Sequence, residues 1–355
     1  MESIERYSNI TVDESRFNWA TYNDVKKKAI NPVDLILYSD KQYEKENFAC
    51  SRFFPDSVIP WIKGYDIFSG KQILVPADFV CYPRMRKKPL VLESSNGAAA
   101  HTNMIQAILN GLFEVIERDA LLIMWLNKLS MPTIEINNLH YSFNQSLKLI
   151  NDFGMQVKLV DLTNDTNVPT VMAVCYNRPN KYPALVIGTA SHIEPEKAIQ
   201  KALFEMEILL VSVLEYPNRR KVEPGYISTP YDHCLFYLNP DMRKYWEFVI
   251  SSEKRSLLPY KTGKGTTDDY GLLMQIVRSL HNLNHRPIYV DITPSDIRRL
   301  GIHVVKTFIT GFQPMYFKED YARYSQRLNT IPERLGYGRA SRTSWKLNIA
   351  PHPLA

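Results

Sequence analysis

The chain has 355 residues, of which 45% are hydrophobic, 23% charged and 12% aromatic. This composition is typical of a folded globular protein and excludes a disordered one. The formal net charge of +6 is a mild excess, which suits acidic partners such as phosphates but does not indicate nucleic acid.

The cysteines and the apolar runs narrow the class further. Cys50, Cys81, Cys175 and Cys234 form no C-x-x-C pair, which excludes a zinc ribbon and suits reduced thiols. No apolar run reaches the roughly 20 residues that span a bilayer, and the N-terminus lacks the pattern of a secretion signal. We therefore expect a cytoplasmic protein that is not associated with a membrane.

Short elements are predicted around two long helices. Residues 1–7 look like the end of a helix, and another helix is predicted around 268–284. Residues 217–240 and the tail from Gly336 onward are predicted to be loops. Branched residues flanked by Asn, Pro and Gly predict strands at 61–80 (two strands around a turn at Ser69-Gly70), 156–163, 168–177, 184–191, 287–293 and 303–310.

The two long helices are the clearest elements. Between Asn103 and Leu129 the chain has no proline and one glycine, and apolar residues recur there at helical spacing. Asn103 suits the N-cap position. The second long helix is predicted from Pro195, a favoured first position, to about Glu215. Strands thus alternate with long helices, and some strands form hairpin-like pairs. We predict a mixed α/β (α+β) fold and, because no linker is visible, a single domain over 1–355.

One acidic–basic motif occurs twice. Glu114, Glu117 and Arg118 form an E-x-x-E-R pattern on the first long helix, and Glu2, Glu5 and Arg6 repeat it. Acids three residues apart project from one face of a helix, where they suit a hard cation such as Mg²⁺, and an adjacent arginine can bind phosphate. A single copy is most simply a surface ion pair. Two copies favour a magnesium–nucleotide site between two helices.

Longer stretches carry a family resemblance. "SSNGAAAHTNMIQAILNGLFEVIERDALLIMWLN" resembles the YcaO family, in particular the branch of ATP-dependent cyclodehydratases that form thiazoline and oxazoline rings in peptides. "VPADFV", "IEPEKAIQKALFEMEI", "TPYDHCLFYLNPD" and "VDITPSDIRRLGIHVV" agree in order and spacing, and "PHPLA" resembles the proline-rich tail of that branch. The resemblance covers the whole chain and implies a YcaO-like ATP-binding fold.

The resemblance also assigns roles to individual residues. ATP and Mg²⁺ are the implied cofactors, and the implied ligands of the metal are Glu2, Glu5, Glu114 and Glu117, with Glu205 on the second long helix as a weaker candidate. The implied ATP contacts are Arg6, Arg118, Gln106 and Lys306. Pro351 and Pro353 of the tail would shape the active site.

Several positions depart from the family pattern. Relatives usually carry a Gly-Lys-Gly segment before the first E-x-x-E-R, so we expect the N-terminus to be truncated. Gln106 stands where many members have an acidic residue, Ile208 where glutamine is usual, and Lys306 where arginine is common. The change at Gln106 keeps an oxygen ligand but removes a charge, and Lys306 lacks the bidentate fork of arginine.

The resemblance implies partners as well. The substrate would be a ribosomal precursor peptide, as in bacteriocin biosynthesis. Because the chain has no separate peptide-binding domain, an E1-like or leader-peptide-binding protein would deliver that peptide. A flavin-dependent dehydrogenase would act where azolines are oxidised, and a homodimer fits the family. Which peptide is modified, and at which side chains, stays open.

Three alternatives remain at this point, of which the simplest is a signalling module that binds acidic peptides. A thioamide-forming enzyme of the same fold would use an external sulfur source, although "PHPLA" and "TPYDH" argue against it. A non-catalytic docking or regulatory subunit is favoured by the truncated start and by Gln106. Binding of ATP that depends on Mg²⁺ separates an enzyme from such a subunit.

Overall fold

The computed structural model describes residues 1–81, 86–92, 94–135, 141–179, 181–215, 222, 227–256, 268–337 and 347–354, and for residues 2 and 141–146 it describes the backbone alone. The chain divides into two compact units. Each unit is assembled from separated stretches: the first from Met1–Asp119, Thr266–Tyr316 and Asp320–Arg327, the second from Ala120–Gly265, Phe317–Glu319 and Leu328–Ala355. Neither unit is continuous in sequence, and the single domain expected over 1–355 stays a prediction.

The first unit contains a six-stranded sheet in which every pair of strands is antiparallel. The strand order is β1-β2-β9-β10-β4, and β3 pairs with β2. The predicted hairpin within 61–80 is confirmed, because its two strands are β2 and β3. The strands are β1 (Asn18–Ala20), β2 (Ile59–Asp66), β3 (Gln72–Pro76), β4 (Ala98–His101), β9 (Pro287–Asp291) and β10 (His303–Ile309).

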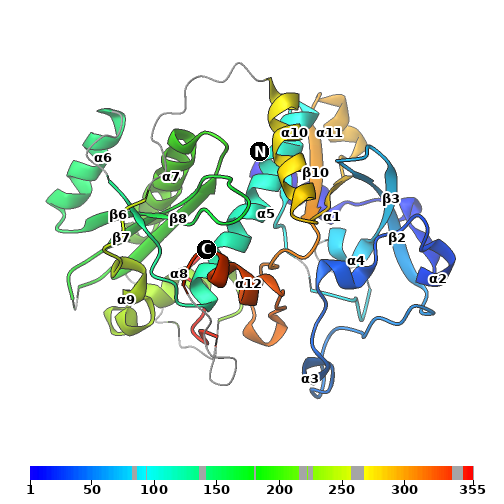
Figure 1. Ribbon diagram of the computed structural model, residues 1–355, viewed down its shortest axis with the longest axis horizontal. Coiled ribbons are helices and arrows are strands. Elements are labelled where there is room, and N and C mark those ends of the chain that lie inside the picture. Colours follow the sequence, from blue (N-terminus) through cyan, green and yellow to red (C-terminus); the bar gives the residue numbers. More distant parts are fainter. Residues whose placement is uncertain are drawn as a thin grey trace. The chain divides into compact units, whose positions relative to one another are not determined.

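The second unit contains a four-stranded antiparallel sheet in the order β5-β6-β7-β8. Its strands are β5 (Thr133–Ile134), β6 (Gln156–Asp161), β7 (Thr170–Tyr176) and β8 (Leu185–Ser191). Helix α7 (Pro195–Leu214) packs on β7 and β8, as Figure 1 shows, and buries Ala198, Ala202 and Met206. The continuous branched residues of β7 and β8 suit this burial, since both strands are almost wholly inside.

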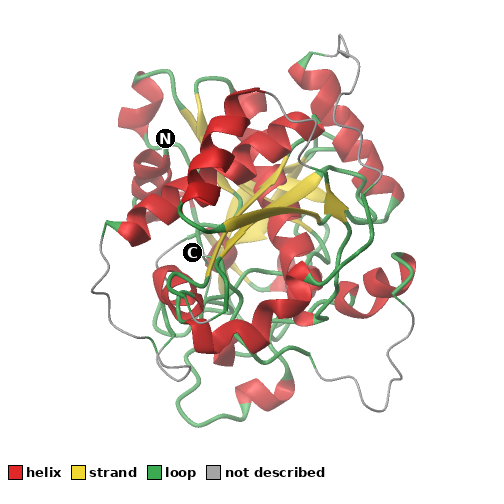
Figure 2. Ribbon diagram, turned by 90° about the vertical axis from the view of Figure 1, so that its left-hand side faces the viewer, coloured by secondary structure: helices red, strands yellow, loops and turns green. Residues whose placement is uncertain are grey.

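The helices follow the sequence predictions in part. Helix α5 (Met104–Leu126) is capped by the Asn103 side chain, which accepts the N–H of Ile105 at 2.8 Å, and α10 (Asp269–Asn282) occupies the region expected near 268–284. Figure 2 shows helices packed alongside the strands. The remaining helices are α1 (Glu2–Ile10), α2 (Tyr22–Val25), α3 (Asp40–Tyr43), α4 (Ala77–Val80), α6 (Tyr141–Asp152), α8 (Pro230–Tyr237), α9 (Arg243–Ile250), α11 (Ser295–Arg299) and α12 (Arg327–Arg334), and the 3₁₀ turns are Glu14–Arg16, Pro32–Leu35, Pro240–Met242 and Glu319–Tyr321.

The loop predicted over 217–240 is wrong for its last part. Helix α8 forms there because Thr229 caps it: the hydroxyl accepts the N–H of Asp232 at 3.2 Å, and the Asp232 carboxylate accepts the N–H of Thr229 at 2.9 Å. Pro230 stands at the first helical position, which its fixed φ favours. This capping box is a local signal that the sequence predictions overlooked.

The chain repeats one strand–turn–helix segment, once in each unit. Gly97–Glu114 aligns without a gap on Gly188–Glu205, at an offset of 91 residues (188 − 97), with the shared pattern G-x-A-x-H-x₅-A-I-x₃-L-F-E. The first copy forms β4 and the start of α5, and the second forms β8 and the start of α7. In both copies the Nδ1 atom of the shared histidine accepts a backbone N–H two residues later at 2.9 Å. The sequence predictions above did not include this repeat, although its pattern is visible in the sequence.

Candidate functional site

One acid of α1 and one acid of α5 bind the backbone of the short segment formed by Gly97 and β4. The backbone N–H of Ala100 donates to Glu5 Oε1 at 2.9 Å, and that of Gly97 donates to Glu114 Oε2 at 2.9 Å. Because β4 is the last strand in the order of its sheet, the amide of Ala100 can face away from the ladder and bind Glu5, whereas Gly97, which binds Glu114, is the residue just before the strand. The structure therefore brings one acid from each E-x-x-E-R motif to the same short segment.

The second motif forms a compact group on α5. The Arg118 guanidinium contacts Glu117 Oε1 through Nη1, and its Nη2 lies 3.9 Å from Glu114 Oε1. Glu117 is only 7% exposed, and the Arg118 side chain is largely buried. A surface ion pair on a solvated helix face, the simplest interpretation of one motif, does not describe this arrangement. Arg118 braces both acids.

Lys306 lies on β10, opposite Ala98 of β4. Its side chain is fully buried, and the ammonium donates to the carbonyl oxygens of Ser94 and Asn96 at 2.5 and 2.6 Å. The lysine therefore holds the segment that leads into β4. This role differs from the phosphate contact that we predicted for Lys306, and that contact stays a prediction.

The other predicted residues of the first unit lie on α1 and α5. Arg6 is exposed, and Glu2 belongs to α1, although its side chain lies outside the described part of the structure. Gln106 is partly exposed in the first turn of α5, where its backbone N–H donates to Asn103 Oδ1 at 3.3 Å. Gln106, Glu114 and Glu117 share one side of α5, since their spacings are close to whole helical turns.

Three predicted residues belong to the second unit. Glu205, on α7, is exposed and accepts the N–H of Thr189 at 3.0 Å. Pro351 and Pro353 are buried in the tail, where Pro351 O accepts the hydroxyl hydrogen of Tyr237. Their predicted roles toward the acids of the first unit stay predictions.

The oxygen donors around Glu5 suit a hard cation. Among the described residues no group of three His, Cys, Asp or Glu side chains is preassembled for a metal ion. One turn after Glu5, however, Ser8 Oγ and Asn9 Oδ1 are buried and have no hydrogen-bond partner in the described part of the chain. Buried polar atoms of this kind favour a further polar group or ion nearby. A carboxylate offers about four acceptor positions, so an amide and a cation can share one side chain.

Asn9 and Ser8 were not among the predicted site residues. The signal in the sequence is spacing: Asn9 follows Glu5 by four residues and so lies on the same side of α1. The Asn9 amide donates from Nδ2 to Glu5 O at 2.8 Å, which directs its Oδ1 atom away from that carbonyl.

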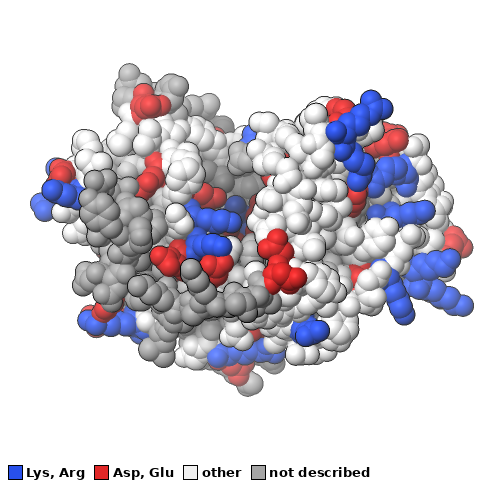
Figure 3. All heavy atoms as spheres, turned by 90° about the horizontal axis from the view of Figure 1, so that it is seen from above, with Lys and Arg blue, Asp and Glu red and all other residues white. Residues whose placement is uncertain are grey.

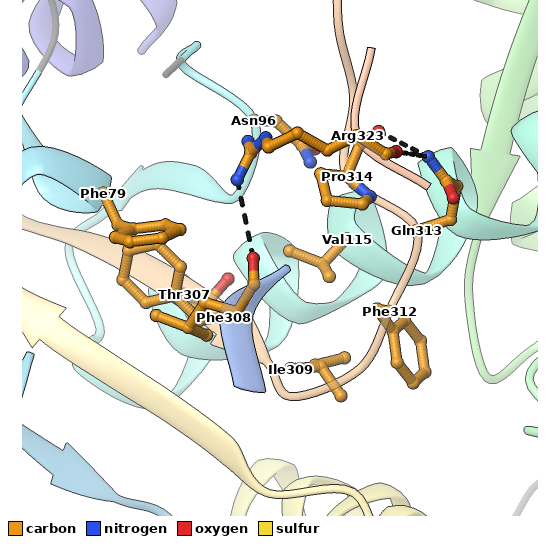
Figure 4. Close-up of a pocket in the computed structure, with 11 residues that line it drawn as sticks. Phe79, Asn96, Val115, Thr307, Phe308, Ile309, Phe312, Gln313, Pro314 and Arg323 are labelled. Carbon is orange, nitrogen blue, oxygen red and sulfur yellow. Dashed lines mark hydrogen bonds between the residues drawn. The ribbon is translucent and has the colours of Figure 1, made fainter. Parts of the chain in front are cut away.

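Two hollows lie in the first unit. The cavity in Figure 4, of about 50 Å³, is lined by Asn96, Val115 and Thr307 among others and is the size of one or two water molecules. A larger recess of about 710 Å³ is lined by Tyr7 of α1 and Thr11, the residue after that helix, together with residues 292–296, 298 and 299. Its volume is that of a small-molecule pocket, but none of the predicted acids lines it.

Three further features were compared with the sequence expectations: the surface charge, the apolar character of the helices and the state of the cysteines. On the face shown in Figure 3, basic and acidic side chains are interspersed. No helix in the described ranges combines the length and the apolar character that crossing a bilayer requires. The four cysteines are buried and form no disulfide, and burial raises the pKa of the Cys81 and Cys175 thiols to about 12.

Comparison with known proteins places the site in a family context. The family model described as YcaO cyclodehydratase, ATP- and Mg²⁺-binding, matches residues 1–313. An uncharacterized protein of Methanothermobacter thermautotrophicus is 26% identical over 338 residues, which are 93% of this chain and 81% of that protein.

Solved structures resemble the fold. The heterocyclase TruD aligns with a TM-score of 0.80 and 22% identity over 99% of this chain and 50% of its own. A heterocyclase in complex with substrate and cofactor aligns with a TM-score of 0.83 and 22% identity over 99% of this chain and 47% of its own. YcaO from Methanopyrus kandleri, bound with AMPPCP and Mg²⁺, aligns with a TM-score of 0.63 and 20% identity over 91% of this chain and 77% of its own. The chain thus spans about half the length of the two heterocyclases.

Proposed function

The chain belongs to the YcaO family, and from this premise we propose that it is an ATP-dependent peptide cyclodehydratase. Its substrate would be a ribosomal precursor peptide whose Cys, Ser or Thr side chains close to thiazoline or oxazoline rings. The observation that carries the proposal is the attachment of Glu5 and Glu114 to amides three residues apart, at Ala100 of β4 and at Gly97 just before it. Carboxylate oxygens from separate helices are suitable ligands for a Mg²⁺ ion that binds triphosphate oxygens.

The reaction needs an activated amide oxygen. A side-chain thiol or hydroxyl of the peptide attacks the preceding carbonyl carbon, and its proton leaves. The amide oxygen is a poor leaving group, and bound ATP would supply the phosphoryl group that lets it depart as phosphate, while the amide nitrogen loses its proton and the C=N bond forms. ATP is thereby converted to ADP.

The residues of this chain would hold and neutralise charge. Glu2, Glu5, Glu114 and Glu117 would supply oxygen ligands to Mg²⁺, whose bound charge offsets that of the triphosphate. Arg118, braced between Glu114 and Glu117, and Arg6, exposed on α1, would face phosphate oxygens. Gln106 and Lys306 are the further ATP contacts that we propose.

Partners are a further part of the proposal. We propose that an E1-like or leader-peptide-binding protein delivers the precursor peptide, as the family resemblance implies. A flavin-dependent dehydrogenase would act after this enzyme if the rings are oxidised, and a homodimer is a further proposal.

The first test is nucleotide binding. The purified chain should bind AMPPCP in a calorimetric titration, and binding should be lost when Mg²⁺ is removed. Absence of Mg²⁺-dependent binding would contradict the proposal and favour a non-catalytic docking subunit. With peptide and partner present, the mass of the product separates ring closure, which releases one water per ring, from thioamide formation, which exchanges oxygen for sulfur.

Glu117→Gln tests the acid group directly. We expect peptide-dependent ATP turnover to fall by at least about 100-fold, because a neutral amide cannot balance the metal and Arg118. The fold should persist, at a stability cost of about 1–3 kcal/mol, since the residue is buried beside Arg118. Measured ADP release should be unchanged in Glu247→Gln, which breaks an exposed glutamate–arginine pair on α9. Retained turnover in Glu117→Gln would count against the acid assignment.

A further inference from the structure

A close backbone contact joins β10, β4 and α5. Thr307 of β10 lies next to Gly97, whose carbonyl oxygen accepts the N–H of Thr307 at 2.8 Å and its hydroxyl hydrogen at 3.1 Å. Thr307 is 1% exposed, so solvent does not compete for the hydroxyl. Figure 4 shows Thr307 beside Val115 of α5 and the small cavity.

Two glycines make the contact possible. A Cβ atom on Gly97 would lie 2.5 Å from Thr307 O, and Gly97 has φ +82°, where glycine is favoured. A Cβ atom on Gly111 of α5 would lie 2.8 Å from both Gly97 O and Thr307 Oγ1. Neither glycine can carry a side chain without a shift of backbone. We call this contact of Gly97, Gly111 and Thr307 the glycine joint.

The glycine joint determines where the two acids attach. Gly97 donates its N–H to Glu114, which lies three residues after Gly111 on α5. Ala100, three residues further along the same segment, donates to Glu5. Lys306 fixes the approach to the joint by binding the carbonyls of Ser94 and Asn96. A change in the separation of α5 and β4 would therefore move Glu114 relative to Glu5.

Comparison with the repeat in the second unit shows which feature of the glycine joint occurs in the first unit alone. There Gly188 approaches α7 as closely, since its Cβ atom would lie 2.3 Å from Ala202 O, and Glu205 accepts the N–H of Thr189. The residue opposite Gly188 is Ala173, which has no hydroxyl. Ile208 stands at the position equivalent to Glu117. The hydroxyl thus occurs only in the copy that carries the complete acid motif.

We propose that Thr307 is a positioning residue, which through the glycine joint sets the place of Glu114 relative to Glu5 for binding Mg²⁺. This inference rests on the proposed function. Replacing the hydroxyl by a methyl group puts carbon 3.1 Å from Gly97 O, closer than the usual 3.3–3.6 Å contact of carbon with oxygen. The methyl group would push Gly97, and Gly111 of α5 beside it, away from Thr307 of β10 by a few tenths of an ångström, and would thereby shift the place of Glu114.

The test compares Thr307→Val with Thr307→Ser by calorimetric titration of AMPPCP at a series of Mg²⁺ concentrations. With valine, the Mg²⁺ concentration that gives half-maximal AMPPCP binding should rise by about tenfold or more, as is common when a residue that supports a metal ligand is replaced. AMPPCP binding should be restored at saturating Mg²⁺. Serine keeps the hydroxyl and should stay within about threefold of the parent chain. Gly111→Ala should behave like valine, because it opens the same contact.

Thr170→Val is the matched control. Thr170 is a buried threonine of the second unit whose hydroxyl binds Val168 O and Ser191, and its replacement should leave the Mg²⁺ dependence unchanged. If Thr307→Val and Gly111→Ala bind like the parent chain, the inference is wrong and the proposed function stands. An equal loss in Thr170→Val would assign the effect to general destabilisation and overturn it too. A parent chain without Mg²⁺-dependent binding would overturn both.

Discussion

At the scale of single residues, three consecutive charges on α5 have different surroundings. Glu117 and Arg118 pair with each other, whereas the next residue, Asp119, is fully buried and binds elsewhere. Its carboxylate accepts from Arg327 Nε at 2.9 Å, from Arg327 Nη2 at 2.8 Å and from the N–H of Gln313 at 2.9 Å. Asp119 therefore holds the first unit together and is not part of the proposed site.

Asp119→Asn should be strongly destabilising. The substitution leaves the buried guanidinium of Arg327 without its counter-charge, which costs about 3–5 kcal/mol. Urea unfolding should show a clearly lower midpoint. As a control, Asp320→Asn breaks the exposed pair with Lys45 and should change the free energy of unfolding by about 0.5 kcal/mol at most. Equal effects of the two substitutions would contradict the argument.

At the scale of elements, the turn from β8 into α7 depends on a neutral histidine. His192 Nδ1 accepts the N–H of Glu194 at 2.9 Å, which a protonated Nδ1 atom cannot do. Burial, followed by the charges of Lys201 and Lys197, lowers the pKa of His192 from 6.5 to about 4, while Glu194 opposes the shift.

His192 should make stability depend on pH in a defined window. Below pH 6.5 the unfolded chain takes up a proton that the folded chain refuses until about pH 4, so the free energy of unfolding falls as pH falls through this range. Discounted for partial exposure, the loss should be about 1–2 kcal/mol. His192→Asn keeps an acceptor for Glu194 and does not titrate. Its urea midpoint should vary less between pH 7 and pH 4.5, and an unchanged slope would contradict the assignment. Burial also lowers the pKa of His233, so some dependence should remain.

The same elements show what the sequence could reveal. Helices α5 and α7 were predictable because Asn103, Pro195 and long apolar periodicity are local signals. The repeated motif predicted that Glu5 and Glu114 act together, which stays a prediction. Their attachment to the amides of Ala100 and Gly97 could not be predicted, since it depends on how β4 and the residue before it pair with β10. Thr307 could not be found at all from sequence. Thr307 is important because it pairs with Gly97, which lies some 200 residues away in the sequence, and residue type alone does not indicate that pairing.

At the scale of the whole molecule, each unit has its own core and its own set of buried hydrogen bonds between segments far apart in the sequence, which we call its clamp. In the second unit the clamp is the tail, whose main-chain oxygens contact three buried side chains. Ala350 O accepts from Trp125 Nε1 at 2.9 Å, Pro351 O from the Tyr237 hydroxyl at 2.5 Å, and His352 O lies 2.8 Å from His233 Nδ1. The rings of His233 and His352 also stack at 4.0 Å between centroids.

Removing the tail should therefore unfold the second unit selectively. A chain that ends at Ile349 leaves the donors of Trp125 and Tyr237 buried without these acceptors, at about 1–3 kcal/mol each. Hydrogen exchange should speed up in the strands of the second unit, while β2, β9 and β10 of the first keep their protection.

The tail also carries two prolines with a predicted catalytic role. A second variant separates this role from the stabilisation of the second unit by the main-chain oxygens of the tail. Replacing Pro351 and Pro353 together by alanine keeps every main-chain oxygen, so stability should change by about 1 kcal/mol or less. If that variant holds its hydrogen-exchange pattern but loses peptide-dependent ATP turnover, the prolines serve the reaction. If turnover persists, the tail acts through its carbonyl oxygens alone, and the catalytic assignment of both prolines is wrong.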